Sequence, residues 1–218
     1  SVKGWIACGA GGLNITHPAT LDPETGYLYQ ANGHGCSGRT VQPGSDTDNE
    51  IHSCTSESGD CTTTGVTVSD WVQGGGVGWS GPQGLPIYKP PYSKITAIDM
   101  NTGEHVFSVP VGEASDQMKR HPALQGIDLT GVGTPRGRAI MMTTGSLLLA
   151  TEGMQGPAVL NAHNKATGEK LGSVDLPATG QYGMMTYMHD GRQFIVVQIG
   201  QGGVFPGSLV ALALPDAE

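Results

Sequence analysis

The sequence predicts an all-β fold that forms part of a β-propeller. Short strand-forming runs alternate with turn signals along most of the chain, and a hairpin followed by further strands occurs three times. Glycine makes up 35 of 218 residues, more than twice its usual share of about 7%, as many tight turns require. Four-stranded antiparallel units that repeat at about 45 residues are typical of propeller blades.

Composition and charge narrow the class of protein. At 37% hydrophobic residues the chain is globular rather than disordered, and its length is that of one domain. The formal net charge of -8 argues against a nucleic-acid backbone or an anionic membrane surface as partner, because both attract clustered Lys and Arg. No apolar run approaches the roughly 20 residues that span a bilayer. The first residue is Ser1 rather than Met, so a signal peptide would not be visible.

Each repeat begins with a hairpin. The first, PATLDPETGYLYQANG, turns at 22–26, and the second, AIMMTTGSLLLATEG, turns at 144–145. The third, GMMTYMHDGRQFIVVQIG, turns at the Asp-Gly pair 190–191. Asp-Gly between alternating apolar residues predicts a type I′ turn, in which both central residues have positive φ.

Two further strands follow the hairpin in the first two repeats. The same motif, Ala-x-x-x-x-Thr-Gly-Glu, joins them within ITAIDMNTGEHVFSV (95–109) and LNAHNKATGEKLGSV (160–174). The third repeat adds only GSLVALALP and has no fourth strand after Leu214 and Pro215. Three blades do not close a ring of four to eight, and open sheet edges and uncovered blade faces are unstable. We therefore expect other polypeptide to supply the remaining blades and the missing strand.

Spacing places an insertion in the first repeat. From the hairpin glycine to the alanine of the third strand, the chain advances 17 residues in the second repeat and 20 in the third, but 71 in the first. The extra residues, roughly 33–92, are polar and turn-rich and contain or border three of the four cysteines. Two cysteines seven positions apart and the later VSDWVQGGGVGW favour an ordered excursion over a disordered loop. The predicted blades span about 12–112, 134–176 and 181–214. Between the first two, EASDQMKR (113–120) could form a short helix.

The four cysteines favour disulfides over a metal site. Cys8, Cys36, Cys54 and Cys61 contain no C-x-x-C pair and have no nearby His at zinc-finger spacing. Cys8 and Cys36 lie near opposite positions across the first hairpin, and Cys54 and Cys61 enclose only six small or polar residues. We therefore favour these two pairings, while the other two pairings stay open. Disulfides indicate an oxidising compartment.

Other candidate metal ligands are weaker. Four histidines are scattered with no two at ligand spacing, and they fit solvated or turn positions better than a metal site: His34, His52, His121 and His163. The run SDTDNE (45–50) offers oxygen ligands for calcium but lacks the glycine and terminal glutamate of an EF-hand loop, which favours a solvated charge run. We assign no metal ligand to this chain.

Five methionines lie on predicted paired strands of the second and third repeats. Adaptable methionine side chains fill gaps between packed sheets. We therefore expect all five in the core: Met141, Met142, Met184, Met185 and Met188.

The repeat resembles that of the pyrroloquinoline-quinone (PQQ)-dependent dehydrogenases, the eight-bladed quinoprotein β-propellers. KPPYSKITAIDMNTGEHVFSVPVG (89–112) and DLPATGQYGMMTYMHDGRQFIVVQIGQGG (175–203) are similar to the membrane-type glucose dehydrogenase and alcohol dehydrogenase branch. GGLNITHPATLDPETGYLYQ (11–30) resembles the segment of the family that begins Gly-x-Asn-Trp. The resemblance covers most of the chain outside the insertion and indicates the C-terminal part of such an enzyme.

The resemblance implies a dehydrogenase, periplasmic or extracellular, that oxidises an alcohol or sugar and passes electrons to a quinone or cytochrome acceptor. PQQ would lie at the propeller axis beside calcium or another cation that polarises its reactive carbonyl. The family's catalytic base and most calcium ligands come from earlier blades, so no residue here is expected to be catalytic. Asn14, by motif match, would hydrogen-bond the cofactor rim, and Gly202, Gly203 and Val204 would line it. The alternatives are a turn residue at Asn14 and a plain loop at 202–204.

Departures from the family pattern leave the substrate open. The family's repeat usually ends in a tryptophan that docks one blade on the next, but Phe107 and Gly172 stand in those places. Ile15 replaces the tryptophan after Asn14, and Val204 stands where the family's alcohol dehydrogenases often have a tryptophan near the quinone. A non-catalytic propeller scaffold that binds proteins would tolerate these losses and is the alternative function. An extracellular adhesion module has only the cysteines in its favour.

Overall fold

The computed structural model is nearly all-β, as the sequence predicts. It describes residues 5–11, 18–43, 52–54, 61–63, 71–77, 81–135, 139–152, 157–201 and 205–215. Among these, the helical elements are short: η2 (Pro82–Gly84), α1 (Asp116–Lys119) and η3 (Pro122–Leu124). None of them is long enough to span a membrane. The chain divides into a blade unit (10–35 and 88–218) and an insertion unit (1–9 and 36–87).

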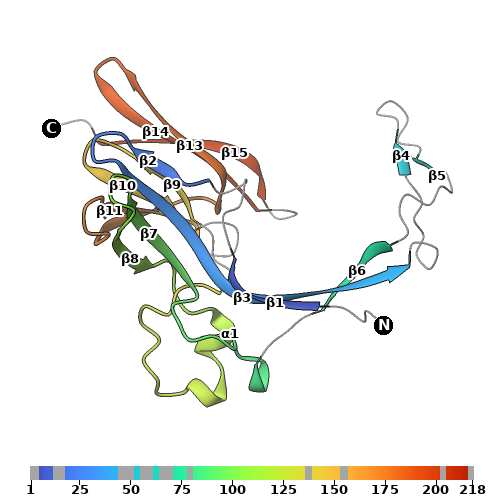
Figure 1. The fold of residues 1–218 in the computed structure, drawn as a ribbon. Helices are drawn as coiled ribbons and strands as arrows, with labels where there is room; N and C mark the ends of the chain where they lie inside the picture. Colours follow the sequence, from blue (N-terminus) through green and yellow to red (C-terminus); the bar gives the residue numbers. More distant parts are fainter. Residues whose placement is uncertain are drawn as a thin grey trace. The chain divides into compact units, whose positions relative to one another are not determined.

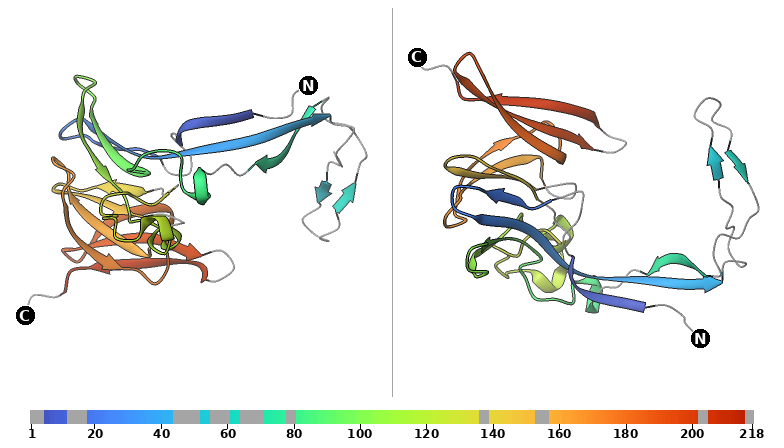
Figure 2. Two further views of the ribbon diagram at one scale, coloured as in Figure 1. Left: turned by 90° about the horizontal axis from the view of Figure 1, so that it is seen from below. Right: turned by 45° about the horizontal axis from the view of Figure 1, so that its top comes forward.

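Three antiparallel sheets make up the blade unit and lie side by side in chain order (Figure 1, Figure 2). The first has the order β2 (Thr20–Asp22), β3 (Tyr27–Pro43), β7 (Ser93–Asp99) and β8 (His105–Pro110). The second has the order β9 (Ile140–Thr143), β10 (Leu147–Thr151), β11 (Val159–Asn164) and β12 (Lys170–Asp175). The third contains β13 (Gly180–His189), β14 (Arg192–Gln201) and β15 (Phe205–Ala213), with no fourth strand among the described residues.

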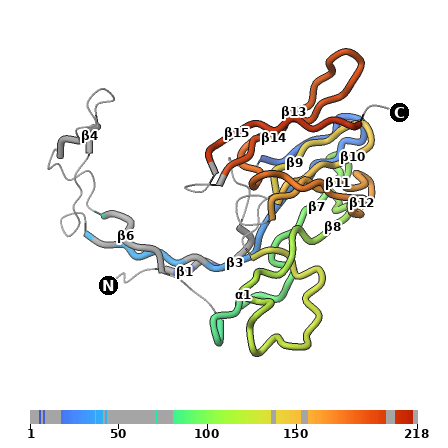
Figure 3. Tube along the Cα trace, turned by 180° about the vertical axis from the view of Figure 1, so that it is seen from behind, coloured from blue at the N-terminus to red at the C-terminus, as the bar shows by residue number. Residues whose placement is uncertain are grey.

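The third hairpin has the turn that its Asp-Gly pair predicts. Asp190 and Gly191 both have positive φ, 49° and 77°, and His189 pairs with Arg192 across them. This is a two-residue type I′ connection, whose twist matches that of the strands. The β13–β14 ladder reaches this turn, while β15 pairs with β14 only as far as Phe194 (Figure 3).

Apolar side chains on alternate strand positions form one core between each pair of neighbouring sheets. Successive residues of a strand point to opposite faces, so Leu148 and Ala150 of β10 pack toward the first sheet while Leu149 packs toward the third. The first core contains Tyr29, Ile95, Ala97, Val111, Ala139, Met141, Leu148 and Ala150. The second contains Leu149, Leu160, Leu176, Ala178, Val197 and Ile199.

The methionine prediction is correct for three residues and wrong for two. Met141 lies in the first core, and Met142 and Met184 pack against the second. Met185 and Met188 are exposed instead, Met188 to 64%. Met185 follows Met184 on β13, so its side chain points away from the second sheet, to a face that no sheet of the described blade unit covers.

The short helix predicted at 113–120 is confirmed and helps to shape the connection between the first two sheets. Ser115 caps α1 by accepting a hydrogen bond from the amide of Met118. The Met118 side chain is buried with Tyr92, Ala114 and Val132 in a small third cluster. This cluster holds the connection against the beginning of β7.

The insertion unit contains the remaining strands and one confirmed disulfide. β1 (Trp5–Gly11) and β6 (Trp71–Val77) pair with β3, and β4 (His52–Cys54) pairs with β5 (Cys61–Thr63). Cys8 and Cys36 are bonded, with their Cα atoms 4.2 Å apart. The backbone register places Cys54 opposite Cys61. The side chains of these two residues lie outside the described part of the structure, so their disulfide stays a prediction, and the run 45–50 also lies outside it.

Candidate functional site

The strand order gives each sheet of the blade unit two different ends. The turn end carries the short turns 23–26, 100–104, 144–146, 165–169 and 190–191. The loop end carries the connections from one sheet to the next and those between the second and third strands of each sheet. At the loop end of the third sheet, Gln201 pairs with Phe205.

The four residues expected to contact a cofactor lie outside the described part of the structure. They are Asn14, Gly202, Gly203 and Val204. Their described neighbours, Gln201 and Phe205, belong to the loop end.

Segments of all three sheets meet around Thr151 and Glu152 at the loop end. A Cβ at Gly112, in the connection after the first sheet, would lie 2.8 Å from Glu152 Oε2 and 2.1 Å from Thr134 Oγ1. A Cβ at Gly180, the first residue of β13, would lie 2.6 Å from the Thr151 side chain. Close approach therefore requires glycine at both positions, and at Gly112 a φ of 73° adds a backbone requirement.

Three buried oxygens without partners lie on β10, β11 and the residue after β10. Within the described residues, Thr151 Oγ1, Glu152 Oε2 and Asn161 Oδ1 are buried and have no hydrogen-bond partner. Buried polar atoms nearly always have one in folded proteins. The oxygens are thus suited to a cation or to a group that donates hydrogen bonds.

Glu152 is the buried carboxyl of this cluster. It is only 5% exposed, and its Oε1 accepts a hydrogen bond of 3.0 Å from Asn161 Nδ2. Burial raises the pKa of Glu152, and the Asn161 hydrogen bond and the Lys170 charge oppose this only in part. Compared with water, this environment therefore favours the neutral, protonated form of the Glu152 carboxyl.

The turn end contains three copies of one turn, where the sequence analysis identified two. In Asp22-Pro-Glu-Thr-Gly, the Asp22 carboxylate accepts from the amide of Glu24, and the Thr25 hydroxyl accepts from the amide of Tyr27. Asp99 and Asn164 accept in the same way from the amides two residues later. The closing glycines all have positive φ: Gly26, Gly103 and Gly168. Asx side chains and glycine thus fix the same geometry three times.

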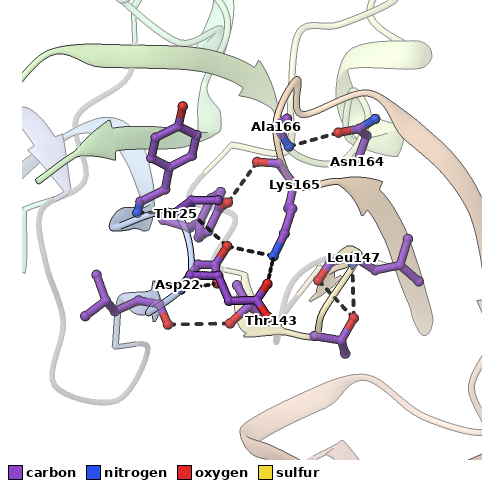
Figure 4. A network of polar contacts seen from close by, with 12 residues as sticks. Asp22, Thr25, Thr143, Leu147, Asn164, Lys165 and Ala166 are labelled. Carbon is purple, nitrogen blue, oxygen red and sulfur yellow. Dashed lines mark hydrogen bonds and ion pairs between the residues drawn. The ribbon is translucent and has the colours of Figure 1, made fainter.

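Two of these turns are joined by a buried ion pair (Figure 4). Lys165 Nζ lies 2.9 Å from Asp22 Oδ2 and 2.9 Å from Glu24 Oε2. The Tyr29 hydroxyl donates to the Lys165 carbonyl over 2.8 Å. Burial raises the pKa of Asp22, but hydrogen bonds from Lys165, Thr25 and the Glu24 amide outweigh it and lower the pKa overall. The pair ties the first sheet to the second.

Phe107 takes the docking position that the family pattern gives to tryptophan. Its ring lies against Gly168 of the second sheet, where a Cβ would approach it to 2.6 Å. It also lies 6.1 Å, centroid to centroid, from the ring of Tyr29. Gly172, at the corresponding position of the second sheet, is exposed, and a Cβ added there would meet no atom within 4 Å. Among the described residues, the docking contact is thus present after the first blade and absent after the second.

The histidine prediction is wrong for His163. It is buried in β11, and its Nδ1 lies 3.0 Å from the Gly168 carbonyl. Burial lowers its pKa, so the neutral ring is favoured. The described residues contain no group of three or more His, Cys, Asp or Glu that could hold a metal ion.

Sequence patterns do not predict the roles of Glu152 and of the Asp22–Lys165 pair. A signal existed for the turn at Asp22, because Asp22-x-x-Thr-Gly repeats the pattern of the other two turns. Nothing along the chain connects Asp22 with Lys165, since their contact depends on how two sheets pack. No sequence pattern predicts the burial of Glu152, because an isolated glutamate before a loop is normally solvated.

Comparison with known proteins decides the family. Residues 5–195 match the β-propeller domain of the glucose, ethanol and alcohol dehydrogenases that use PQQ. The chain belongs to the PQQ-dependent dehydrogenase β-propeller family. This family membership confirms the resemblance that the repeat motifs carry.

Relatives of this propeller chain agree with that assignment. Quinoprotein glucose dehydrogenase of Escherichia coli (strain K12) is 34% identical over 156 residues, 70% of this chain and 18% of that protein. The glycerol dehydrogenase large subunit of Gluconobacter thailandicus is 32% identical over 168 residues, 72% of this chain and 20% of that protein. Quinohemoprotein alcohol dehydrogenase from Comamonas testosteroni shares the fold, with a TM-score of 0.52 at 17% identity over 90% of this chain and 25% of that one. The chain spans about a fifth of the length of these curated relatives.

The described loop end of this propeller chain fits a polar ligand. The unpartnered oxygens of Thr151, Glu152 and Asn161 suit a bound cation or a donor group. The residues expected to touch the quinone ring itself lie outside the described part, at positions 14 and 202–204.

Proposed function

We propose that this chain is the C-terminal part of a PQQ-dependent dehydrogenase that oxidises an alcohol or sugar and passes electrons to a quinone or cytochrome acceptor. Its three blades would span about 12–112, 134–176 and 181–214, with 33–92 as an insertion in the first. The observation that carries the proposal is that the chain contains three antiparallel sheets of this propeller family and spans about a fifth of the length of its relatives.

The free face of the third blade supports a partner that continues the ring. On β13 and β14, Tyr187 stacks on Phe194 with centroids 5.2 Å apart, and the neighbouring Met185 is exposed. On β15, Leu209 is 74% exposed. Exposed apolar patches of this kind indicate an interaction surface. The partner would be the polypeptide that carries the remaining blades.

The cofactor and metal would lie at the loop end. Asn14 would hydrogen-bond the PQQ rim, and the segment Gly202, Gly203 and Val204 would line it. Bound PQQ would accept the electrons of the substrate, and calcium or another cation would polarise its carbonyl. The catalytic base would come from the other blades. This chain would therefore supply binding and orientation.

A periplasmic or extracellular location is part of the proposal. The Cys8–Cys36 disulfide supports it, because structural disulfides persist in oxidising compartments.

The decisive experiment uses the assembled propeller, meaning this chain together with the polypeptide that carries the other blades. PQQ and calcium are added to the purified assembly, and dye reduction is followed over a panel of alcohols and sugars. We expect dye reduction that requires PQQ and at least one of these substrates. An assembly that binds no PQQ and reduces no dye would contradict the proposal and favour the scaffold alternative, for which the loss of a docking side chain at Gly172 is the supporting observation.

A further inference from the structure

We propose that Glu152, Asn161 and Thr134 form a binding site for a monovalent metal cation, sodium or potassium, between the first and second sheets. The site consists of described residues of this chain alone, and it does not depend on the proposed function. The ion would neutralise the buried Glu152 carboxylate and would hold the connection 111–135 against the end of β10.

The oxygens of the site come from three segments of the chain. Glu152 follows β10, Asn161 lies on β11, and Gly112 and Thr134 belong to the connection between the first two sheets. A Cβ at Gly112 would lie 2.8 Å from Glu152 Oε2 and would also contact Thr134 Oγ1. These two oxygens are therefore no more than about 5 Å apart, the limit for two oxygens that each bind one cation at about 2.3–2.6 Å.

Two of the side chains have buried oxygens that lack a partner. Glu152 is 5% exposed and Asn161 is 4% exposed, and neither Glu152 Oε2 nor Asn161 Oδ1 has a hydrogen-bond partner. Asn161 Nδ2 donates to Glu152 Oε1 over 3.0 Å, so the amide is held beside the carboxyl. The Thr134 hydroxyl donates to the Glu113 carbonyl over 3.1 Å, which leaves its lone pairs available to a cation.

Thr151 faces the opposite way and is not part of the site. Successive strand residues point to opposite faces of a sheet, and the Thr151 side chain lies against Gly180 of the third sheet. The proposed site therefore lies on the face of the second sheet that meets the first, where Leu148 and Ala150 also pack.

The charge of Glu152 favours a cation over a buried water molecule. An ionised carboxylate is costly to bury unless a positive charge compensates it, and a water molecule brings none. Among the described charged residues, Lys170 and Glu113 act on Glu152. Both are exposed, and Glu113 is paired with Lys119 at 2.8 Å. Burial raises the pKa of Glu152, and a bound cation would stabilise the ionised form instead.

The ligand set fits a monovalent ion better than a divalent one. It contains one carboxylate and otherwise neutral oxygens, so a single positive charge balances it, and a second buried charge would itself need compensation. Calcium takes six to eight oxygens, carboxylates among them. The described residues contain no group of three or more His, Cys, Asp or Glu that could hold a metal ion. Sodium or potassium is the class of ion that remains.

The first test measures the stability of the assembled propeller, without PQQ, in different salts. Melting temperatures of the unmodified assembly, Glu152→Gln and Glu113→Gln are compared in sodium, potassium, calcium and choline chloride at equal ionic strength. We expect sodium or potassium to raise the melting temperature of the unmodified assembly by at least about 2 °C over choline, because an ion that binds only the folded state stabilises it. The rise should disappear in Glu152→Gln. It should persist in Glu113→Gln, which removes the same charge from an exposed neighbour.

The second test measures binding directly, by the line width of the sodium NMR signal. Gly112→Ala would place a methyl group beside Glu152 Oε2, whereas a Cβ at Gly131 would meet only Pro110, at 3.6 Å. Both glycines have similar φ, 73° and 71°, so the backbone cost of the two substitutions is matched. We expect the unmodified assembly and Gly131→Ala to broaden the sodium signal. Glu152→Gln and Gly112→Ala should abolish that broadening.

Equal melting temperatures in all four salts, with no more sodium broadening by the unmodified assembly than by Glu152→Gln, would overturn the site. Stabilisation by calcium alone that Glu152→Gln abolishes would overturn its assignment to a monovalent ion. A rise lost equally in Glu113→Gln would show a general effect of surface charge and would also contradict the site. Because PQQ is absent throughout, none of these failures bears on the proposed function, which its own dye-reduction experiment tests.

Discussion

Lys165 is held by two carboxylates that differ sharply in exposure. The side chain of Asp22 is 3% exposed and that of Glu24 is 67% exposed, although both lie 2.9 Å from the same ammonium group. An exposed ion pair contributes little because water and salt screen it. Removing one partner of a buried pair leaves an uncompensated charge and is strongly destabilising.

We predict that Lys165→Met lowers the free energy of unfolding of the assembled propeller by about 3 kcal/mol. Glu24→Gln should lower it by less than about 1 kcal/mol. Urea unfolding at neutral pH measures both. Equal effects of the two substitutions would show that the lysine acts through the exposed carboxylate instead.

Glu152 gives a second prediction at this scale, in the dependence of stability on pH. Its pKa in the folded state is raised above the ordinary value of 4.5, chiefly by burial. A group with a raised folded pKa contributes stability that is complete below its unfolded pKa and is lost as pH rises through the folded pKa. Glu152→Gln keeps the shape of the side chain but does not ionise. The melting temperature of this variant, measured by thermal unfolding, should therefore fall less than that of the unmodified protein as pH rises above 4.5. Parallel curves would contradict the buried, unpaired state of this carboxyl.

At the scale of elements, the Thr-Gly turn explains why the motif recurs. The glycine of each copy has positive φ, and at Gly168 the ring of Phe107 also fills the space of a side chain. At Gly103 a Cβ would meet nothing within 4 Å. Substitutions at Gly103 and Gly168 therefore distinguish the cost of a positive φ from the cost of losing space beside Phe107.

We predict that Gly103→Ala lowers the free energy of unfolding by about 1–2 kcal/mol, the cost of a left-handed backbone for alanine. Gly168→Ala should cost about 2–4 kcal/mol, because overpacking against Phe107 adds to the backbone term. Chemical unfolding of the two variants in the assembled propeller measures both free energies of unfolding. A smaller effect at Gly168 than at Gly103 would contradict the docking of Phe107.

The cysteine pairings give a prediction for the insertion unit. The Cys8–Cys36 bond is present, and strand register places Cys54 opposite Cys61, so we expect the second bond there. Peptide mapping without reduction should recover both linked pairs. A linked peptide of Cys36 and Cys54, or four free thiols, would show the assignment to be wrong.

Sequence reasoning predicted local geometry better than contacts between sheets. The hairpin at 190–191 and the short helix at 116–119 follow from neighbouring residues alone, and both were predictable. The burial of His163 and the pairing of Asp22 with Lys165 depend on which face of one blade meets the next, and no local pattern encodes that. The same holds for Met185, which is exposed because no sheet of the described blade unit covers its face of β13.

At the scale of the whole molecule, we propose that the three blades are parts of a larger ring. Two cores lie between the three sheets, while the outer face of the third sheet exposes Met185, Tyr187 and Leu209. Each uncovered blade face forgoes about 25 cal/mol for every Å² of apolar surface that a neighbour would bury. A chain of this kind depends on its neighbours for stability.

The most direct test of this account is thermal unfolding of the purified chain, alone and in the assembled propeller, with the mass followed by light scattering. We predict that the chain alone aggregates or unfolds without a cooperative transition, whereas the assembly melts in one sharp transition at the mass of the complete ring. A monomeric 218-residue species that melts cooperatively on its own would contradict the central claim that these blades are completed by another polypeptide.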